Sequence, residues 1–186
     1  MKEYSSPFSV NNNNYLITGA SSGIGRSLSI LLSRSGANLI LIDIDEAGLL
    51  ETKSECKDTD KIVALDLRRS SEIKVVLQKA VIGFGKLHGF VHLAGKPYIS
   101  PLKSISEKKC EEIFLLNTYA VLELAKYFIN RNIYAGERGS IVLISSIYAL
   151  VGSAANIGYA MSKSALHGIT KSLAIELAPK KIRVNC

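Results

Sequence analysis

Tyr159 and Lys163 are the residues of this chain whose types and spacing most directly suggest proton chemistry. They lie four positions apart, separated by Ala160, Met161 and Ser162, which a helix tolerates. On a helix, residues four apart share a face, with about 5–6 Å between their Cβ atoms. An ammonium at that distance favours the ionised form of a phenol, which in free tyrosine appears only near pH ~10. The pair is therefore a candidate general acid and base, although the same spacing also arises by chance.

Two hydroxyl groups precede this pair, at the end of an apolar segment. Residues 141–144 read Ile-Val-Leu-Ile, a run typical of a fully buried strand. Ser145 and Ser146 follow, at the carboxyl end where open α/β sheets place their ligands. Ser146 is thus expected to reach the same substrate oxygen as Tyr159, unless both serines simply form a turn.

A glycine-rich turn, TGASSGIG, runs from Thr18 to Gly25. Its glycines are spaced differently from the GxGxxG dinucleotide fingerprint, but the physical logic is shared. Gly19 permits a tight turn after a strand, Gly23 lets the backbone approach a phosphate, and Gly25 allows the following helix to pack closely. A pyrophosphate would then bind at the helix N-terminus, where free N–H groups favour anions. A plain tight turn is the alternative interpretation.

Short apolar strands alternate with helical segments along most of the chain. Such alternation predicts right-handed βαβ crossovers and an α/β fold with a doubly wound parallel sheet, covered by helices on both faces. We expect a tail over residues 1–14 and a single domain over residues 15–186. Strands are expected at residues 15–18, 38–42, 62–65, 89–93, 141–144 and 182–185, and helices at 23–35, 46–56, 71–84, 107–131 and about 159–177.

The composition limits what kind of protein this chain can be. Hydrophobic residues make up 47% of 186 residues, which is enough for the core of one domain. The formal charge is +7, but the basic residues are scattered, so we expect solvated helix faces and no nucleic-acid partner. The three cysteines and three histidines are too dispersed for a disulfide framework or a metal site. Because no signal peptide or membrane-spanning run is present, we expect a cytoplasmic protein.

Three motifs together resemble the short-chain dehydrogenase/reductase family. They are TGASSGIG at residues 18–25, YAMSK at residues 159–163, and a serine thirteen positions before the tyrosine. Their order and spacing match the family, and the resemblance covers nearly the whole chain from Tyr15 onward. It implies a Rossmann-like fold that binds a nicotinamide dinucleotide and interconverts a small-molecule carbonyl and a secondary alcohol by hydride transfer.

The resemblance also implies roles for four catalytic residues. Tyr159 would be the general acid and base, assisted by Lys163, which would also hold the nicotinamide ribose. Ser146, favoured over Ser145 by its spacing, would polarise the substrate carbonyl. Asn117, in FLLNTYAV, matches an asparagine that orders a water leading protons toward the lysine. An asparagine in an apolar helix could instead simply bond a neighbouring carbonyl.

The implied cofactor site follows the strand ends. Asp43 would bind the adenosine ribose and repel a 2′-phosphate, so NAD(H) is favoured over NADP(H); the alternative for Asp43 is a helix or turn cap. Ser22 stands at a position often basic in NADP-preferring relatives, and Arg26 is expected to face solvent. Asp66 would contact adenine. The full predicted set is Gly19, Ser21, Ser22, Gly23, Ile24, Gly25, Asp43, Ile44, Asp66, Leu67, Ala94, Gly95, Tyr159 and Lys163.

Two features depart from the family pattern. Residues 92–95 read His-Leu-Ala-Gly where the family has NNAG, so the bonding of the asparagines would fall to His92 or be lost. We expect His92 to be a satisfied residue of the sheet rather than a catalytic one. The sequence also ends within the sixth predicted strand, before the family's substrate loop and seventh strand. A second hypothesis is therefore a non-catalytic dinucleotide-binding module or an inactive fragment of such an enzyme.

The resemblance also bears on assembly. Family members commonly pair through the helices that correspond to those carrying Asn117 and Tyr159. Both helices have apolar faces in this sequence, so we expect a homodimer or homotetramer.

Overall fold

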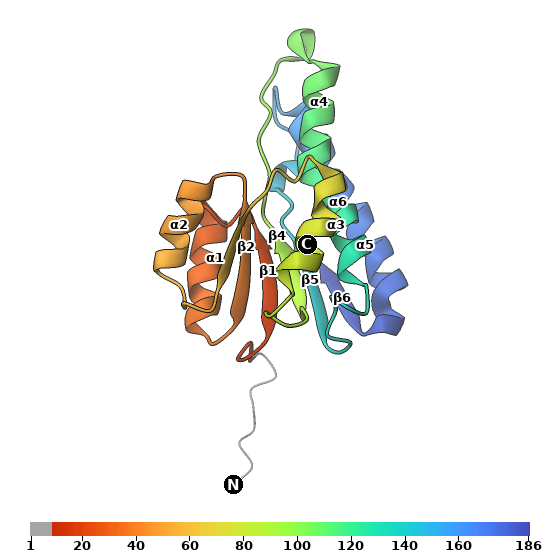
Figure 1. Cartoon of the computed structure of the whole chain (residues 1–186). Helices are drawn as coiled ribbons and strands as arrows, with labels where there is room; N and C mark the ends of the chain where they lie inside the picture. The colour runs from red at the N-terminus through yellow and green to blue at the C-terminus, as the bar shows by residue number, and fades with distance from the viewer. Residues whose placement is uncertain (1–8) are drawn as a thin grey trace.

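The computed structural model describes residues 9–186, in which six parallel strands form one sheet (Figure 1). The strands are β1 (Asn14–Thr18), β2 (Asn38–Asp43), β3 (Lys61–Ala64), β4 (Gly89–His92), β5 (Gly139–Leu143) and β6 (Ile182–Asn185). Their order across the sheet is β3-β2-β1-β4-β5-β6, so the direction of winding reverses between β1 and β4. Ligands of open α/β sheets bind at such a switch point, outside the carboxyl ends of the strands.

Helices lie on both faces of this sheet, as the sequence predicts. Figure 1 shows α1 and α2 on one side and α3, α5 and α6 on the other. Across residues 9–186, none of the helices has the length and apolar character that crossing a membrane requires. Their bounds are α1 (Gly23–Arg34), α2 (Glu46–Ser54), α3 (Ser70–Ala80), α4 (Glu107–Phe114), α5 (Ala120–Phe128) and α6 (Ile157–Leu177).

Alternate residues of the central strands supply two separate cores. Successive side chains of a strand point to opposite faces of a sheet. Leu16 of β1 accordingly packs in a large core with residues of α3, α5 and α6, whereas Ile17 packs in a smaller core against α1 and α2. At β6 the alternation leaves Arg183 and Asn185 exposed on the α1 side, so no helix within residues 9–186 covers that part of the sheet.

The predicted order of elements is confirmed, while several boundaries differ. β1 begins at Asn14, whose buried side-chain amide donates to Lys86 O at 2.9 Å. Asn14 also pairs with Asn38 in the register of β1 and β2, so it belongs to the sheet rather than to the lead-in. Residues 1–8 of the predicted tail lie outside the described residues. The helix expected to reach residue 84 ends at Ala80, and the turn after it contains Gly83 and Gly85 with φ values of 67° and 106°.

The helix expected over residues 107–131 is three segments rather than one. A π-helical segment, Leu115–Tyr119, joins α4 to α5 and carries Asn117 at its centre. Such widened turns are rare and occur frequently at functional sites. Apolar periodicity continues through the segment, so the sequence pattern gave no sign of it.

Candidate functional site

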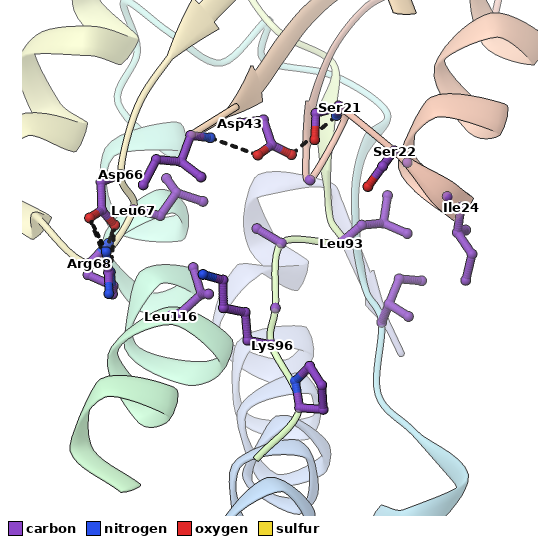
Figure 2. A pocket seen from close by; sticks show the side chains of 18 of the residues that line it. Ser21, Ser22, Ile24, Asp43, Asp66, Leu67, Arg68, Leu93, Lys96 and Leu116 are labelled. Atoms are coloured by element: carbon purple, nitrogen blue, oxygen red, sulfur yellow. Dashed lines mark hydrogen bonds and ion pairs between the residues drawn. The ribbon is translucent and has the colours of Figure 1, made fainter. Parts of the chain in front are cut away.

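A cavity of about 480 Å³ lies at the carboxyl ends of the strands, beside the switch point (Figure 2). Its volume is within the range of about 300–1,000 Å³ that is usual for ligand sites. Every residue predicted to bind the cofactor lines it, from the glycine-rich turn to Tyr159 and Lys163. Other residues that line the cavity are not in the predicted set, because most of them belong to no motif. They are Leu65, Arg68, Leu93, Lys96, Pro97, Leu116, Ile144 and Ser145.

Two glycines of the turn are required by close backbone approaches. Gly19 has φ of +71°, and a Cβ added to it would lie 2.6 Å from the backbone nitrogen of Ala94, in the turn after β4. A Cβ on Gly25 would lie 1.9 Å from the carbonyl oxygen of Gly19. The loop is therefore pressed between the turn after β4 and the first turn of α1, as the predicted roles of these glycines require.

The N-terminus of α1 leaves its amides available to a ligand. Ser22 occupies the N-cap position in an extended conformation, but its side chain makes no capping hydrogen bond, and the first turn contains no acidic residue. Ser22, Gly23, Ile24 and Gly25 all line the cavity. Unfilled first-turn N–H groups together with the helix dipole favour an anion at this point.

Asp43 closes β2 at the cavity and is held there by backbone amides. Its carboxylate accepts hydrogen bonds from Ser21 N at 3.2 Å, Ile44 N at 2.7 Å and Asp45 N at 3.2 Å. Asp43 thus caps the turn after β2, which is one of the alternatives expected for it, whereas the cap of α2 is Asp45, which accepts from Gly48 N at 3.1 Å. A carboxylate offers about four acceptor positions, so one position on Oδ2 of Asp43 remains for a ligand.

Asp66 lies at another edge of the cavity, where it forms an ion pair with Arg68 (Figure 2). Nε of Arg68 donates to Oδ1 at 2.9 Å and Nη2 donates to Oδ2 at 2.6 Å, which is a bidentate arrangement. These hydrogen bonds hold the pKa of the Asp66 carboxyl below its usual range. Asp66 and Leu67 belong to the predicted cofactor site, whereas Arg68 does not; its position two residues after Asp66 is the sign of the pairing in the sequence.

Lys163 and Tyr159 line the same part of the cavity from α6. Nζ of Lys163 donates to Ile144 O at 2.7 Å, just beyond the end of β5. Only 4% of the residue is exposed, and burial lowers the pKa of Lys163 to about 8. The Tyr159 ring meets that of Tyr148 edge to face, with centroids 6.5 Å apart.

The two candidate serines have different surroundings. Ser145 lines the cavity, and its Oγ donates to Lys163 O at 3.1 Å or bonds His167 Nε2 at 3.0 Å. Ser146 is not among the lining residues; it caps the 3-10 turn Ile147–Ala149, where its Oγ accepts from Tyr148 N at 3.3 Å. Because Ser146 accepts in that bond, its own hydroxyl proton remains free to be donated.

Asn117 lies behind the cavity wall and is completely buried. Its Oδ1 accepts from Lys96 N at 3.0 Å, and its Nδ2 donates to Lys96 O at 3.1 Å and Ser162 Oγ at 3.0 Å. A Cβ added to Gly95 would lie 3.0 Å from Oδ1 of Asn117 and 3.3 Å from Nζ of Lys163. The absence of a side chain at Gly95 therefore allows this turn to pack directly against Asn117 and Lys163, two of the predicted catalytic residues.

His92 is a satisfied residue of the sheet, as predicted. The Thr18 hydroxyl accepts from both Leu93 N and Ala94 N at 3.2 Å, so its single proton must go to Nδ1 of His92, 2.9 Å away. We therefore assign the proton of the neutral ring to Nε2, which lies 3.3 Å from Leu116 O. Burial, together with the nearby charge of Lys163, lowers the pKa of His92 to about 3. His92 thus ties the ends of β1 and β4 together, which is the bonding expected of the missing asparagines.

Comparison with known proteins gives similarities to dehydrogenases and reductases. The family model described as short chain dehydrogenase matches residues 13–186. A similar curated protein is the diacetyl reductase [(S)-acetoin forming] of Staphylococcus epidermidis, 33% identical over 178 residues, which are 91% of this chain and 67% of that protein. The chain spans 60–69% of the length of eight similar curated proteins.

Solved structures agree in fold. A candidate short-chain alcohol dehydrogenase from Sinorhizobium meliloti 1021 superposes with a TM-score of 0.89 at 31% identity, covering 96% of this chain and 71% of the other. Carveol dehydrogenase from Mycobacterium avium, solved with NAD, gives 0.87 at 28% identity over 95% of this chain and 70% of the other. A candidate short-chain dehydrogenase from Shigella flexneri, solved with NADP, gives 0.86 at 29% identity over 96% and 77%.

Proposed function

Because this chain belongs to the short-chain dehydrogenase family, we propose that it binds a nicotinamide dinucleotide and interconverts a carbonyl compound and a secondary alcohol. One observation carries the proposal. A single cavity joins a helix N-terminus with unfilled amides, a carboxylate at the end of β2, and the Tyr159–Lys163 pair. These are an anion site, a ribose site and a proton donor in one continuous groove.

The residues present fit such a cofactor along the length of the cavity. Asp66 and Leu67 would flank the adenine, and the remaining acceptor position of Asp43 would take one ribose hydroxyl. The first turn of α1 would hold the pyrophosphate. Lys163 would hold the nicotinamide ribose above the turn formed by Ala94 and Gly95.

NAD(H) is the cofactor that this arrangement favours. A 2′-phosphate beside Asp43 would meet a like charge that three backbone amides hold in place. Ser22 brings no cation to balance it, and the guanidinium of Arg26 is paired with Glu51 at 2.7 Å. Solved neighbours contain either NAD or NADP, so the preference depends on these residues of this chain.

The chemistry at the other end of the cavity follows from the polar side chains there. When bound, the cofactor supplies hydride to the carbonyl carbon or accepts it from the alcohol carbon. In reduction, Tyr159 donates its phenolic proton to the carbonyl oxygen, and in oxidation it takes that proton back. Ser146 does not line the cavity, but its hydroxyl proton is free, and we assign it a hydrogen bond to the same oxygen on the strength of the family resemblance. The Lys163 ammonium stabilises the phenolate that proton donation leaves.

We further propose that the protein pairs with copies of itself through the helices that carry Asn117 and Tyr159. Leu115, Tyr119 and Leu122, on the π-helical segment and α5, are 40%, 54% and 38% exposed. Met161 on α6 is 47% exposed. Light scattering after gel filtration should give a dimer or tetramer, and Leu122→Glu should shift it toward the monomer; a monomeric wild type would contradict this proposal.

The experiment for the function itself is a titration followed by an assay. NADH and NADPH are titrated calorimetrically into the purified protein, and NADH oxidation is then followed with a panel of small ketones, diketones and aldehydes. Saturable NADH binding with turnover supports the proposal. Binding without turnover on any carbonyl would favour the non-catalytic module instead, and absence of binding would contradict both.

A further inference from the structure

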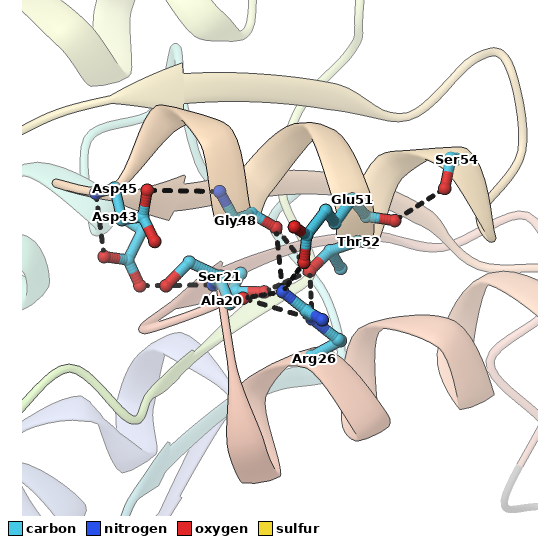
Figure 3. Close-up of polar contacts among 9 residues, drawn as sticks. All are labelled: Ala20, Ser21, Arg26, Asp43, Asp45, Gly48, Glu51, Thr52 and Ser54. Atoms are coloured by element: carbon cyan, nitrogen blue, oxygen red, sulfur yellow. Dashed lines mark hydrogen bonds and ion pairs between the residues drawn. The ribbon is translucent and has the colours of Figure 1, made fainter.

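A hydrogen-bonded network joins the glycine-rich loop to α2, and Arg26 lies at its centre (Figure 3). Arg26 is in the first turn of α1, and its Nε donates to Ser21 O and to Thr52 Oγ1, each at 3.1 Å. Its Nη2 also donates to Ser21 O, and pairs with Glu51 Oε2 at 2.7 Å. The prediction that Arg26 faces solvent is wrong, because its guanidinium reaches sideways to α2 rather than outward.

The first turns of α2 fit closely against the same loop. A Cβ added to Gly48 would lie 2.8 Å from Ser21 Cβ and 2.9 Å from Ser21 O, so only glycine allows this approach. The fully buried Thr52 places its Oγ1 2.8 Å from Ala20 O and 3.0 Å from Gly48 O, and its single proton is shared between these two acceptors. The backbone of Ala20 and Ser21 is therefore held by α2 on one side and by Arg26 in between.

Ser21 connects this network to the cavity. Its carbonyl oxygen accepts from Arg26, while its amide donates to Oδ2 of Asp43 at 3.2 Å. Both ends of one residue are thus fixed, and Ser21 itself is only 5% exposed. Oδ2 of Asp43 is also the atom with an acceptor position left for a ribose hydroxyl.

We propose that Arg26 is a positioning residue for dinucleotide binding, which acts through Ser21 on the phosphate loop and on Asp43. This inference rests on the proposed function. Arg26 does not line the cavity, so it contributes by holding the loop in the binding conformation before the cofactor arrives. Losing it would weaken binding without changing the proton chemistry at Tyr159.

The chain contains a matched control for this role. Arg34, two turns further along α1, pairs with Glu55 just beyond α2 at 3.3 Å. Like the Arg26–Glu51 pair it links α1 to the α2 region, but no contact of Arg34 with the glycine-rich loop is present in the described structure. Arg26→Met and Arg34→Met therefore remove similar ion pairs, and only the first removes the hydrogen bonds to Ser21.

The test measures NADH affinity by calorimetry, melting temperature, and amide hydrogen exchange of residues 19–22. We expect Arg26→Met to weaken NADH binding about tenfold, the size of one lost charged hydrogen bond, and Arg34→Met to leave it within about twofold. kcat at saturating NADH should be unchanged in both. Exchange of residues 19–22 should accelerate in Arg26→Met alone, even without cofactor.

The outcomes distinguish a failure of the positioning role of Arg26 from a failure of the proposed dinucleotide binding. If wild type binds NADH and Arg26→Met binds it equally well, the positioning role is overturned, whatever happens to the melting temperature. If wild type binds no dinucleotide, the proposed function fails, and the exchange rates alone decide whether Arg26 orders the loop. Should Arg26→Met fail to fold, Arg26→Lys takes its place, since lysine keeps the charge opposite Glu51 but cannot reproduce the forked contact with Ser21.

Discussion

Asn117 and Lys96 exchange two hydrogen bonds, with Oδ1 accepting from Lys96 N at 3.0 Å and Nδ2 donating to Lys96 O at 3.1 Å. The second Nδ2 proton goes to Ser162 Oγ on α6. One side chain thereby fastens the turn after Gly95 to the helix that carries Tyr159. The family resemblance implies that Asn117 orders a water on a proton path, and that role stays a prediction. Its side chain has this positioning role as well.

Replacing Asn117 by alanine should therefore destabilise the protein. Lys96 N and O and Ser162 Oγ would each lose a buried partner, and we expect the free energy of unfolding to fall by about 3 kcal/mol. Urea denaturation measures the change. Asn130→Ala is the control, because Asn130 is exposed and its side chain bonds only Asn132 N among the described contacts. Equal effects of the two substitutions would show that the buried bonds contribute nothing.

The charge of Asp43 should set the choice between the two cofactors. In Asp43→Asn the repulsion of a 2′-phosphate disappears, so the ratio of the NADPH to the NADH dissociation constant should fall by at least about tenfold. Calorimetric titration of both nucleotides measures it. Asp45→Asn is the control and should leave the ratio unchanged. It removes a charge two residues away but keeps the cap of α2, since asparagine also caps helices. An unchanged ratio in Asp43→Asn would refute the role of that carboxylate.

His92 should make the protein less stable in mild acid. Its pKa is about 3 when folded and near 6.5 when unfolded, so between these values the unfolded state binds more protons. The free energy of unfolding therefore falls as the pH drops below 6.5, by up to about 1.4 kcal/mol per pH unit. Between pH 7.5 and pH 5 this contribution amounts to about 2 kcal/mol.

His92→Asn isolates that contribution. Asparagine does not titrate, and its side chain can both accept from Thr18 and donate toward Leu116. The difference in unfolding free energy between wild type and variant should change by about 2 kcal/mol from pH 7.5 to pH 5. His88, whose pKa burial also lowers, is present in both proteins and cancels. Parallel pH profiles would mean that folding does not lower the pKa of His92.

The fold and the cavity could be predicted because their determinants are local. Strand and helix order followed from short apolar runs, and part of the cavity lining followed from the glycines and acidic residues at the ends of those runs and from the Tyr159–Lys163 pair inside α6. The π-helical segment around Asn117 could not be predicted, because the apolar periodicity of the sequence continues through it while the helical turn becomes wider. Arg26 was missed for a related reason: its partners Gly48 and Thr52 are distant in sequence and have no motif.

The central claim is that Tyr159 supplies the proton in a reaction whose hydride comes from the dinucleotide. Its most direct test is the rate of NADH oxidation by Tyr159→Phe, with a carbonyl substrate that wild type reduces and at saturating NADH. Tyr148→Phe serves as the control, because that ring packs against Tyr159 and also loses only a hydroxyl. We predict that Tyr159→Phe loses about 10²–10⁴-fold in kcat while its NADH affinity stays close to that of wild type. Turnover of Tyr159→Phe at the wild-type rate would contradict the account.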